Sequence, residues 1–167
     1  MKRTIVLLLI VIIAASCRIS YKFNGASIDY SLVKTLHIAE FRNQASMVYA
    51  PLSQRFNEEM KDFFTKNTKL SLTELNPDLE IEGEIVRYDL SPLAVKEDSY
   101  ASQTRLTMSV RMRYRNNKNP QEDKEETITA YRDFDSSQML TDVQDGLIDE
   151  LTKDIVDQIF NTTMSNW

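Results

Sequence analysis

Strict alternation over residues 104–115 constrains the fold more than any other feature of the sequence. In the stretch TRLTMSVRMRYR, apolar and polar side chains take turns. The apolar set is Leu106, Met108, Val110, Met112 and Tyr114, and the polar set is Arg105, Thr107, Ser109, Arg111, Arg113 and Arg115. Successive side chains of a strand point to opposite faces, so the pattern predicts a strand with one buried and one solvated face.

Apolar spacing predicts the elements around this strand. Loose alternation indicates a first strand over 33–41, and apolar residues at helical spacing after Pro51 indicate a helix over 51–67. Two more strands are expected over 79–90 and 126–134. A long apolar stripe at helical spacing then predicts a final helix that begins near Thr141.

The order of these elements predicts an α+β fold. A strand, a helix, three strands and a helix give two helices packed on a mainly antiparallel four-stranded sheet. Within LEIEGEIVRYDL, Gly83 interrupts the apolar face, and the apolar phase changes after Ile85. Gly83 indicates a bulge or the close approach of another backbone, and the change of phase also fits a bulge.

The start of the chain has the pattern of an export signal. Lys2 and Arg3 precede the apolar run Ile5–Ala15. A membrane-spanning helix needs about 20 apolar residues, so this run suits a signal peptide instead. Small residues then lead to Cys17, the only cysteine, as in a bacterial lipobox. We therefore predict a signal peptide over 1–16 and lipidation of Cys17. An ordinary signal peptide with an incidental cysteine is the alternative, although a lone thiol is a liability in an exported protein.

Lipidation would decide where the protein resides. Two or more acyl chains anchor a protein stably, whereas one chain binds only marginally. Arg18 stands where the inner-membrane retention signal of enteric bacteria has Asp. We expect a lipid-anchored segment over 17–32, one domain over 33–167, and a location on the periplasmic face of the outer membrane.

Composition and motifs argue against several classes of function. The net charge of −5 becomes more negative when Lys2 and Arg3 are removed, which disfavours nonspecific binding to nucleic acid. His37, the only histidine, lies in a predicted strand without the partners that a metal site needs. Ser136 and Ser137, in DFDSS, have no general base nearby in the sequence and suit a turn before the last helix. We predict a protein that is not an enzyme and has no catalytic residue, metal or cofactor.

A hairpin through the loop 91–102 would bring acidic and basic side chains together. If the hairpin is centred on this loop, Glu82 lies opposite Arg111 and Glu80 opposite Arg113, with Glu84 opposite Ser109. One interpretation is a ladder of cross-strand ion pairs. The other is a row of contacts with anionic lipid, in which Arg105 and Arg115 lack acidic partners and bind phosphate groups. The candidate contacts are Arg105, Arg111, Arg113 and Arg115.

An ordered set of short motifs resembles a known family. The motifs are YKFNGASI (with Tyr21, Phe23, Gly25, Ser27 and Ile28), LSQRF, EGEI followed by YDLSPLAV, RLTMSVRMRY, FDSSQ and the terminal IFNTTMSNW. Together they are similar to the lipopolysaccharide-assembly lipoproteins of the LptE family, in a form divergent from the enteric one. The resemblance covers nearly all of the chain after Cys17.

The resemblance implies both a fold and a role. Members of the family pack two helices on a four-stranded sheet and sit inside the barrel of LptD, where they take part in moving lipopolysaccharide to the outer leaflet. Lipopolysaccharide itself is an implied ligand. The alternative is an auxiliary lipoprotein of a different envelope lipid transporter, or an activator of an envelope enzyme. An anchored hydrolase is disfavoured because the sequence offers no catalytic triad.

Overall fold

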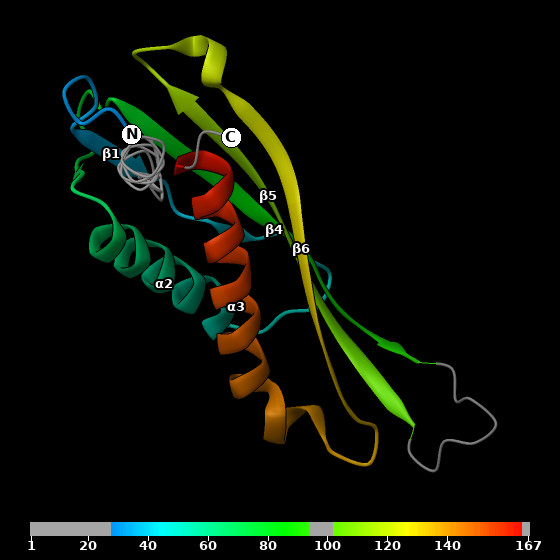
Figure 1. Ribbon diagram of the computed structural model, residues 1–167. Helices are drawn as coiled ribbons and strands as arrows, with labels where there is room; N and C mark the ends of the chain where they lie inside the picture. Colours follow the sequence, from blue (N-terminus) through cyan, green and yellow to red (C-terminus); the bar gives the residue numbers. More distant parts are fainter. Residues whose placement is uncertain (1–27, 94–101, 165–167) are drawn as a thin grey trace, which may run out of the picture.

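The computed structural model describes residues 28–93 and 102–164. Figure 1 shows a long twisted sheet with both helices on one of its faces. In chain order the elements are β1 (Thr35–Ile38), β2 (Arg42–Asn43), α2 (Pro51–Asn67), β3 (Ser71–Leu72), β4 (Leu79–Pro92), β5 (Gln103–Asn116), the 3₁₀ helix η1 (Pro120–Glu122), β6 (Lys124–Asp135) and α3 (Leu140–Met164).

Strands β4, β5 and β6 form an antiparallel meander that dominates the sheet. The apolar side chains of β5 are all buried, as the alternation predicts. The expectation of a fully solvated opposite face is wrong for Thr107 and Ser109, which are each only 5% exposed. These two side chains are short and have a strand on either side, and the Ser109 hydroxyl lies 2.8 Å from that of Thr129 on β6.

In the part of the chain that the structure describes, the sheet has six strands and is mixed, which corrects the prediction of four mainly antiparallel strands. Its order is β3-β1-β4-β5-β6, and β2 also pairs with β4. In place of the strand predicted over 33–41 there are two shorter parts: β1, which ends at Ile38, and β2, which begins at Arg42, one residue beyond the predicted range. Both parts run parallel to β4, since the intervening helix α2 carries the chain back to the same end of the sheet. The sixth strand, β3, has two residues and is too short to give a periodic signal.

Both helices lie where the apolar periodicity of the sequence predicted them. Helix α2 spans the predicted range and ends where Thr68 donates its backbone N–H and its hydroxyl to the Phe64 carbonyl. Helix α3 begins one residue before Thr141. The ring of Phe160 on α3 meets the rings of Phe63 and Phe64 on α2, with centroids 5.3 Å apart in each pair. None of the helices in the described ranges is long and apolar enough to cross a membrane.

One core lies between the helices and the sheet. Its apolar residues come from β1, α2, β4, β5, β6 and α3. Ile28 and Tyr30, from the segment that precedes the predicted domain, also pack against this core. The predicted bulge in β4 is confirmed, because its register with β5 shifts between Ile85 and Arg87.

The carboxylate of Asp78, just before β4, stabilises the region where β1 begins. Its Oδ2 accepts the backbone N–H groups of Lys34 at 2.8 Å and Thr35 at 3.1 Å, and its Oδ1 lies 2.9 Å from Nζ of Lys118. The ammonium group of Lys118 and these N–H donors hold the pKa of the Asp78 carboxyl well below its usual range. The carboxylate therefore joins β1 to the loops that precede β4 and follow β5.

We expect Asp78→Asn to lower the free energy of unfolding by about 1–2 kcal/mol at neutral pH, because it weakens hydrogen bonds to a charged acceptor. The pKa is lower in the folded state, so the contribution is complete above pH ~4 and is lost as the pH falls through the folded pKa. Urea unfolding at several pH values measures this, and the gap between variant and parent should close in acid.

Glu126→Gln provides the matched control, since Glu126 is exposed on β6 and has no ion pair with any described residue. It should leave the stability nearly unchanged at neutral pH. An Asp78→Asn protein as stable as the parent at neutral pH would show that the contacts of Asp78 contribute little.

Candidate functional site

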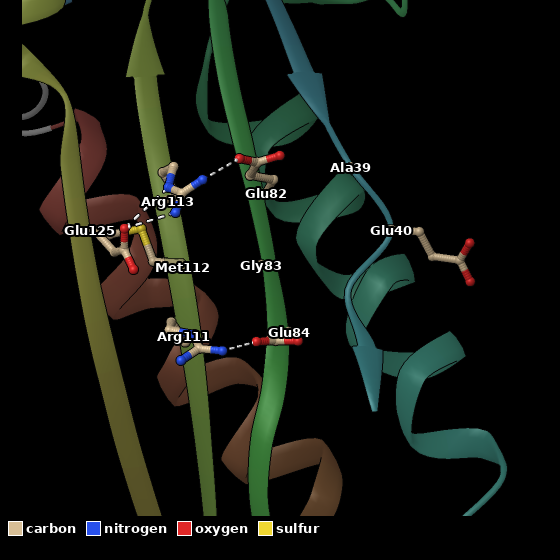
Figure 2. Close-up of a pocket in the computed structure, with 9 residues that line it drawn as sticks. All are labelled: Ala39, Glu40, Glu82, Gly83, Glu84, Arg111, Met112, Arg113 and Glu125. Carbon is tan, nitrogen blue, oxygen red and sulfur yellow. Dashed lines mark hydrogen bonds and ion pairs between the residues drawn. The ribbon is translucent and has the colours of Figure 1, made fainter. Parts of the chain in front are cut away.

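The face of the sheet opposite the helices carries a two-sided network of ion pairs, which we call the charge ladder. Figure 2 shows Arg111 and Arg113 on β5 reaching toward carboxylates on β4 and β6. The ladder consists of Glu82 and Glu84 on β4, Arg111, Arg113 and Arg115 on β5, and Glu125 on β6. These residues alternate with buried ones along their strands, so the backbone itself directs them to the open face.

Each arginine of the ladder has a carboxylate partner. Arg111 pairs with Glu84. Glu82 lies between two arginines, 3.3 Å from Arg113 and 3.1 Å from Arg115. Arg113 also reaches Glu125 on β6, at 3.0 Å. The arrangement neutralises charge in pairs along the face and leaves no guanidinium of the ladder without an acidic neighbour.

The predicted register of this hairpin is wrong by two residues. Glu80, Glu82 and Glu84 lie opposite Arg115, Arg113 and Arg111, respectively. The prediction assumed a loop centred on 91–102, whereas pairing continues to Pro92 opposite Thr104. A slip of two residues keeps every side chain on its face, so the apolar pattern cannot reveal the error.

The expectation that Arg105 and Arg115 lack acidic partners is also wrong. Arg115 pairs with Glu82, as described above. Arg105 holds Asp133 on β6 with two hydrogen bonds, of 2.7 and 2.9 Å, and stacks 3.7 Å from the centroid of the Tyr131 ring. The guanidinium group of Arg105 lowers the pKa of the Asp133 carboxyl, and desolvation opposes this shift. The prediction considered only the pairing of β5 with β4, whereas this partner comes from β6.

A groove of about 520 Å³ opens beside the ladder, where β1 and β2 separate from each other. Its charged lining comprises Glu40, Glu82, Glu84, Glu125, Arg111 and Arg113, so carboxylates outnumber guanidinium groups. In Figure 2 the side chain of Glu40 points away from the ladder. An anion that enters this groove must therefore compete with the carboxylates that already hold the arginines.

Gly83 lies in the wall of the groove and is required by the packing behind it. A Cβ at this position would lie 2.4 Å from the Arg111 carbonyl oxygen and 2.4 Å from a ring carbon of Phe41. Phe41 belongs to the linker between β1 and β2, and its ring fills the space that a side chain at position 83 would occupy. The close backbone approach predicted from the sequence at Gly83 is confirmed.

Helix α2 holds Phe41 in this position. Asn57 accepts the Phe41 N–H at 2.8 Å and donates to the Phe41 carbonyl at 3.0 Å, and the Ser53 hydroxyl donates to the same carbonyl. The backbone of Phe41 therefore bonds to the helix, whereas Ala39, earlier in the linker, still donates its N–H to the Ile81 carbonyl of β4 at 2.9 Å. Asn57 was missed at the sequence level, although a polar residue next to Phe56 on a buried helix face was the available signal.

The structure also places the histidine and the serine-containing turn that the sequence analysis considered. His37 lies in β1, as predicted, with Nδ1 3.2 Å from the Thr73 carbonyl oxygen. Asp135 accepts the Ser137 N–H at 2.8 Å in the turn before α3, which confirms the turn predicted there. Within residues 28–93 and 102–164, no three His, Cys, Asp or Glu side chains are arranged so that they could hold a metal ion. Cys17 lies outside the described residues, so its lipidation stays a prediction.

Comparisons with known proteins agree with this fold. The sequence model of LptE, described as lipopolysaccharide-assembly, matches residues 33–163. The chain belongs to the LptE family. The family is not enzymatic, so the prediction that this protein is not an enzyme is confirmed. A search among curated proteins found no match.

Solved structures support the fold of this LptE-family protein. A hypothetical protein from Chlamydia trachomatis has 12% identity and a TM-score of 0.53, covering 80% of this chain and 99% of its own. A protein from Xanthomonas campestris has 10% identity and a TM-score of 0.56, covering 79% of this chain and 84% of its own. At these identities the likeness concerns the fold alone.

We expect Gly83→Ala to lower the free energy of unfolding by about 1–3 kcal/mol, because the added methyl group meets a backbone oxygen and a held ring. Chemical denaturation of the purified variant measures this loss. Gly146→Ala is the matched control, because a Cβ there meets nothing within 4 Å and alanine favours the helix. Equal stability of the Gly83→Ala variant and the parent would contradict the packing role of Gly83.

Proposed function

We propose that this protein is an outer-membrane lipoprotein, anchored through Cys17, that partners an LptD-type barrel in lipopolysaccharide transport. The observation that carries the proposal is the LptE match over residues 33–163 in a chain whose only cysteine follows an apolar run and small residues. Acyl chains on Cys17 would hold the domain at the periplasmic face of the membrane. Residues 18–27 would then link the anchor to the domain.

The open face of the sheet suits a partner with a polar, water-filled interior. The lumens of transmembrane barrels are polar, because their strands alternate apolar residues outward with polar residues inward. A charged surface loses hydration when it is enclosed, which costs free energy. The net cost is smaller when each charge keeps a partner of opposite sign. The charge ladder gives Arg111, Arg113 and Arg115 such partners within the protein itself.

Lipopolysaccharide is the ligand that we propose for the same surface. Arg105, Arg111, Arg113 and Arg115 stay the predicted contacts with anionic groups such as lipid A phosphates. Arginine binds phosphate with the same forked geometry with which it binds carboxylate. An anionic lipid would therefore bind by replacing carboxylates, and at Arg105 it would have to displace the two-bond pair with Asp133.

We expect a complex with a barrel protein in equal amounts when the tagged protein is purified from solubilised outer membranes. Depletion of the protein should reduce surface lipopolysaccharide. Normal surface lipopolysaccharide in depleted cells with a correctly assembled barrel would contradict the transport role. Recovery of an inner-membrane transporter or an envelope enzyme would favour the auxiliary-lipoprotein alternative.

The anchor has its own test and serves as the control. Mass spectrometry of the mature N-terminus should find an acylated Cys17. Cys17→Ala should leave the protein uncleaved or away from the outer membrane. An unmodified first residue at any other position would contradict lipidation, whatever the partner proves to be.

The arginines have a test that separates phosphate contact from a ladder that only pairs charges. If they contact anionic lipid, the double variant Arg105→Glu and Arg115→Glu should weaken lipopolysaccharide binding at low salt, and the effect should shrink at high salt. Asp133→Asn should strengthen binding, because it frees the guanidinium of Arg105 from a competing carboxylate. Binding to immobilised lipopolysaccharide measures all three proteins.

Arg55→Glu is the matched control, because Arg55 is also paired with carboxylates and its side chain is 33% exposed, against 32% for Arg105. Arg55 lies on α2 and pairs with α3, away from the open face. If all the variants bind lipopolysaccharide as the parent does, the row of arginines only pairs charges.

A further inference from the structure

Among the described residues, strand β6 has a neighbouring strand on one side only and so forms one margin of the sheet. It runs for 12 residues, stands last in the strand order and pairs with β5 without a shift of register. Figure 1 shows it along one side of the sheet, with α3 on the helical face beside it. The opposite margin is different, because β3 has only two residues.

The direction of the free backbone groups follows from the pairing. Ser136 donates its N–H to the Ser102 carbonyl at 3.0 Å, so even-numbered residues of β6 bond to β5. The N–H and C=O groups of Thr127, Thr129 and Tyr131 then point outward. Among the described residues, one hydrogen bond covers this stretch, from the Arg132 side chain to the Tyr131 carbonyl at 2.9 Å.

The middle of this margin lacks the devices that usually protect an edge strand, whereas both ends of β6 carry charged residues. Such strands are commonly short, bulged, or interrupted by proline or charged residues. The stretch 127–131, TITAY, contains no charge, proline or bulge, and its residues favour extended backbone. The side chains of Thr127, Thr129 and Tyr131 are exposed.

We propose that the free edge of β6 binds an extended segment of a partner protein as an added strand, with basic side chains toward α3. Strand addition at an open edge supplies affinity through main-chain hydrogen bonds and selectivity through alternate side chains. The charge of the added segment follows from the flank of α3 beside this edge. Glu150 and Asp154 lie there, each 2.6 Å from Arg132 of β6, and Glu126 lies on the same face of the sheet.

The same charges argue against a second copy of this chain as the occupant. Two β6 strands paired about a two-fold axis would place both α3 helices on one side of the joined sheet. Glu150 and Asp154 of one copy would then approach those of the other, and like charges in such positions repel. The proposal goes beyond lipopolysaccharide transport and holds for any envelope protein that offers a suitable segment.

The test uses a short synthetic peptide in which lysine and threonine alternate, mixed with the full-length 15N-labelled protein. The peptide should slow the amide exchange of Thr127 and Thr129, whose N–H groups point outward. The amides of Ile128 and Ala130 bond to β5 and should exchange slowly with and without the peptide. A peptide with glutamate in place of lysine, or with its ladder-forming amides methylated, should give no protection.

A pair of proline variants locates the binding on the protein. Thr127→Pro removes an outward N–H and should weaken peptide binding about fivefold or more. Leu72→Pro is the matched control, because Ser71 and Thr73 bond to β1 and the Leu72 amide therefore points away from the sheet at the other margin. It should leave binding unchanged. Circular dichroism melting checks that both variants fold.

Several results would overturn the proposal. They are the absence of binding at millimolar peptide, protection confined to other strands, and equal affinity of the methylated peptide. Self-association of the free protein that Thr127→Pro abolishes would identify a second copy as the occupant instead. Because the methylated peptide needs no protein variant, the proposal stays open to refutation even if Thr127→Pro does not fold.

Discussion

The antiparallel pairing of β4 with β5 is the interaction on which the rest of the structure depends. It joins residues from Leu79 opposite Asn116 to Pro92 opposite Thr104. One face of this strand pair is apolar and receives both helices, and the other is charged and open.

The alternation of apolar and polar residues does not fix the register of β4 against β5, because the strands can slip by two residues without exposing the core. The charges remove this freedom: the observed register matches three glutamates with three arginines, whereas the slipped register would match only two. Opposite charges on directly opposed residues are favourable, so the charge ladder selects the register that the core leaves open.

A second constraint follows from the first, because β4 must accept neighbours on both of its sides. Where the linker between β1 and β2 departs from the ladder, its backbone groups need other partners. Asn57 and Ser53 of α2 provide them at Phe41, and the ring of Phe41 then occupies the space above Gly83. One buried amide side chain thus links the helix to the edge of the sheet. The same arrangement creates the groove beside the ladder, since β1 and β2 leave a gap where they part.

Much of the fold was predictable because it rests on periodicity. The range of α2, the start of α3, the alternation of β5 and the bulge after Ile85 all have local signals in the sequence. The parallel pairing of β1 was missed, although a strand, a helix and a strand in succession favour it. The two-residue strand β3 has no such signal and exists because β1 offers it an edge.

The site was harder to predict than the fold, because it depends on which strands are neighbours. Arg105 seemed unpartnered only because β4 was considered and β6 was not, yet Asp133 and Tyr131 lie on β6 directly beside it. Counting acid–arginine matches over alternative registers would have found the ladder. Asp78 offers no comparable signal, since its role depends on backbone groups of Lys34 and Thr35 that are distant in the sequence.

The open face and the free margin of the sheet differ in the kind of contact that they support. On the open face the charges are already paired, so a partner that encloses it gains little from any one residue and is selected mainly by shape. At β6 no strand of the described ranges lies beside the backbone groups of Thr127 and Thr129, and a partner gains directional hydrogen bonds only in the correct register. A protein held at a membrane by its N-terminus could use both surfaces at once, because they belong to different sides of the same sheet. The tether would then raise the effective concentration of the domain near its partner, so that neither contact needs to be strong alone.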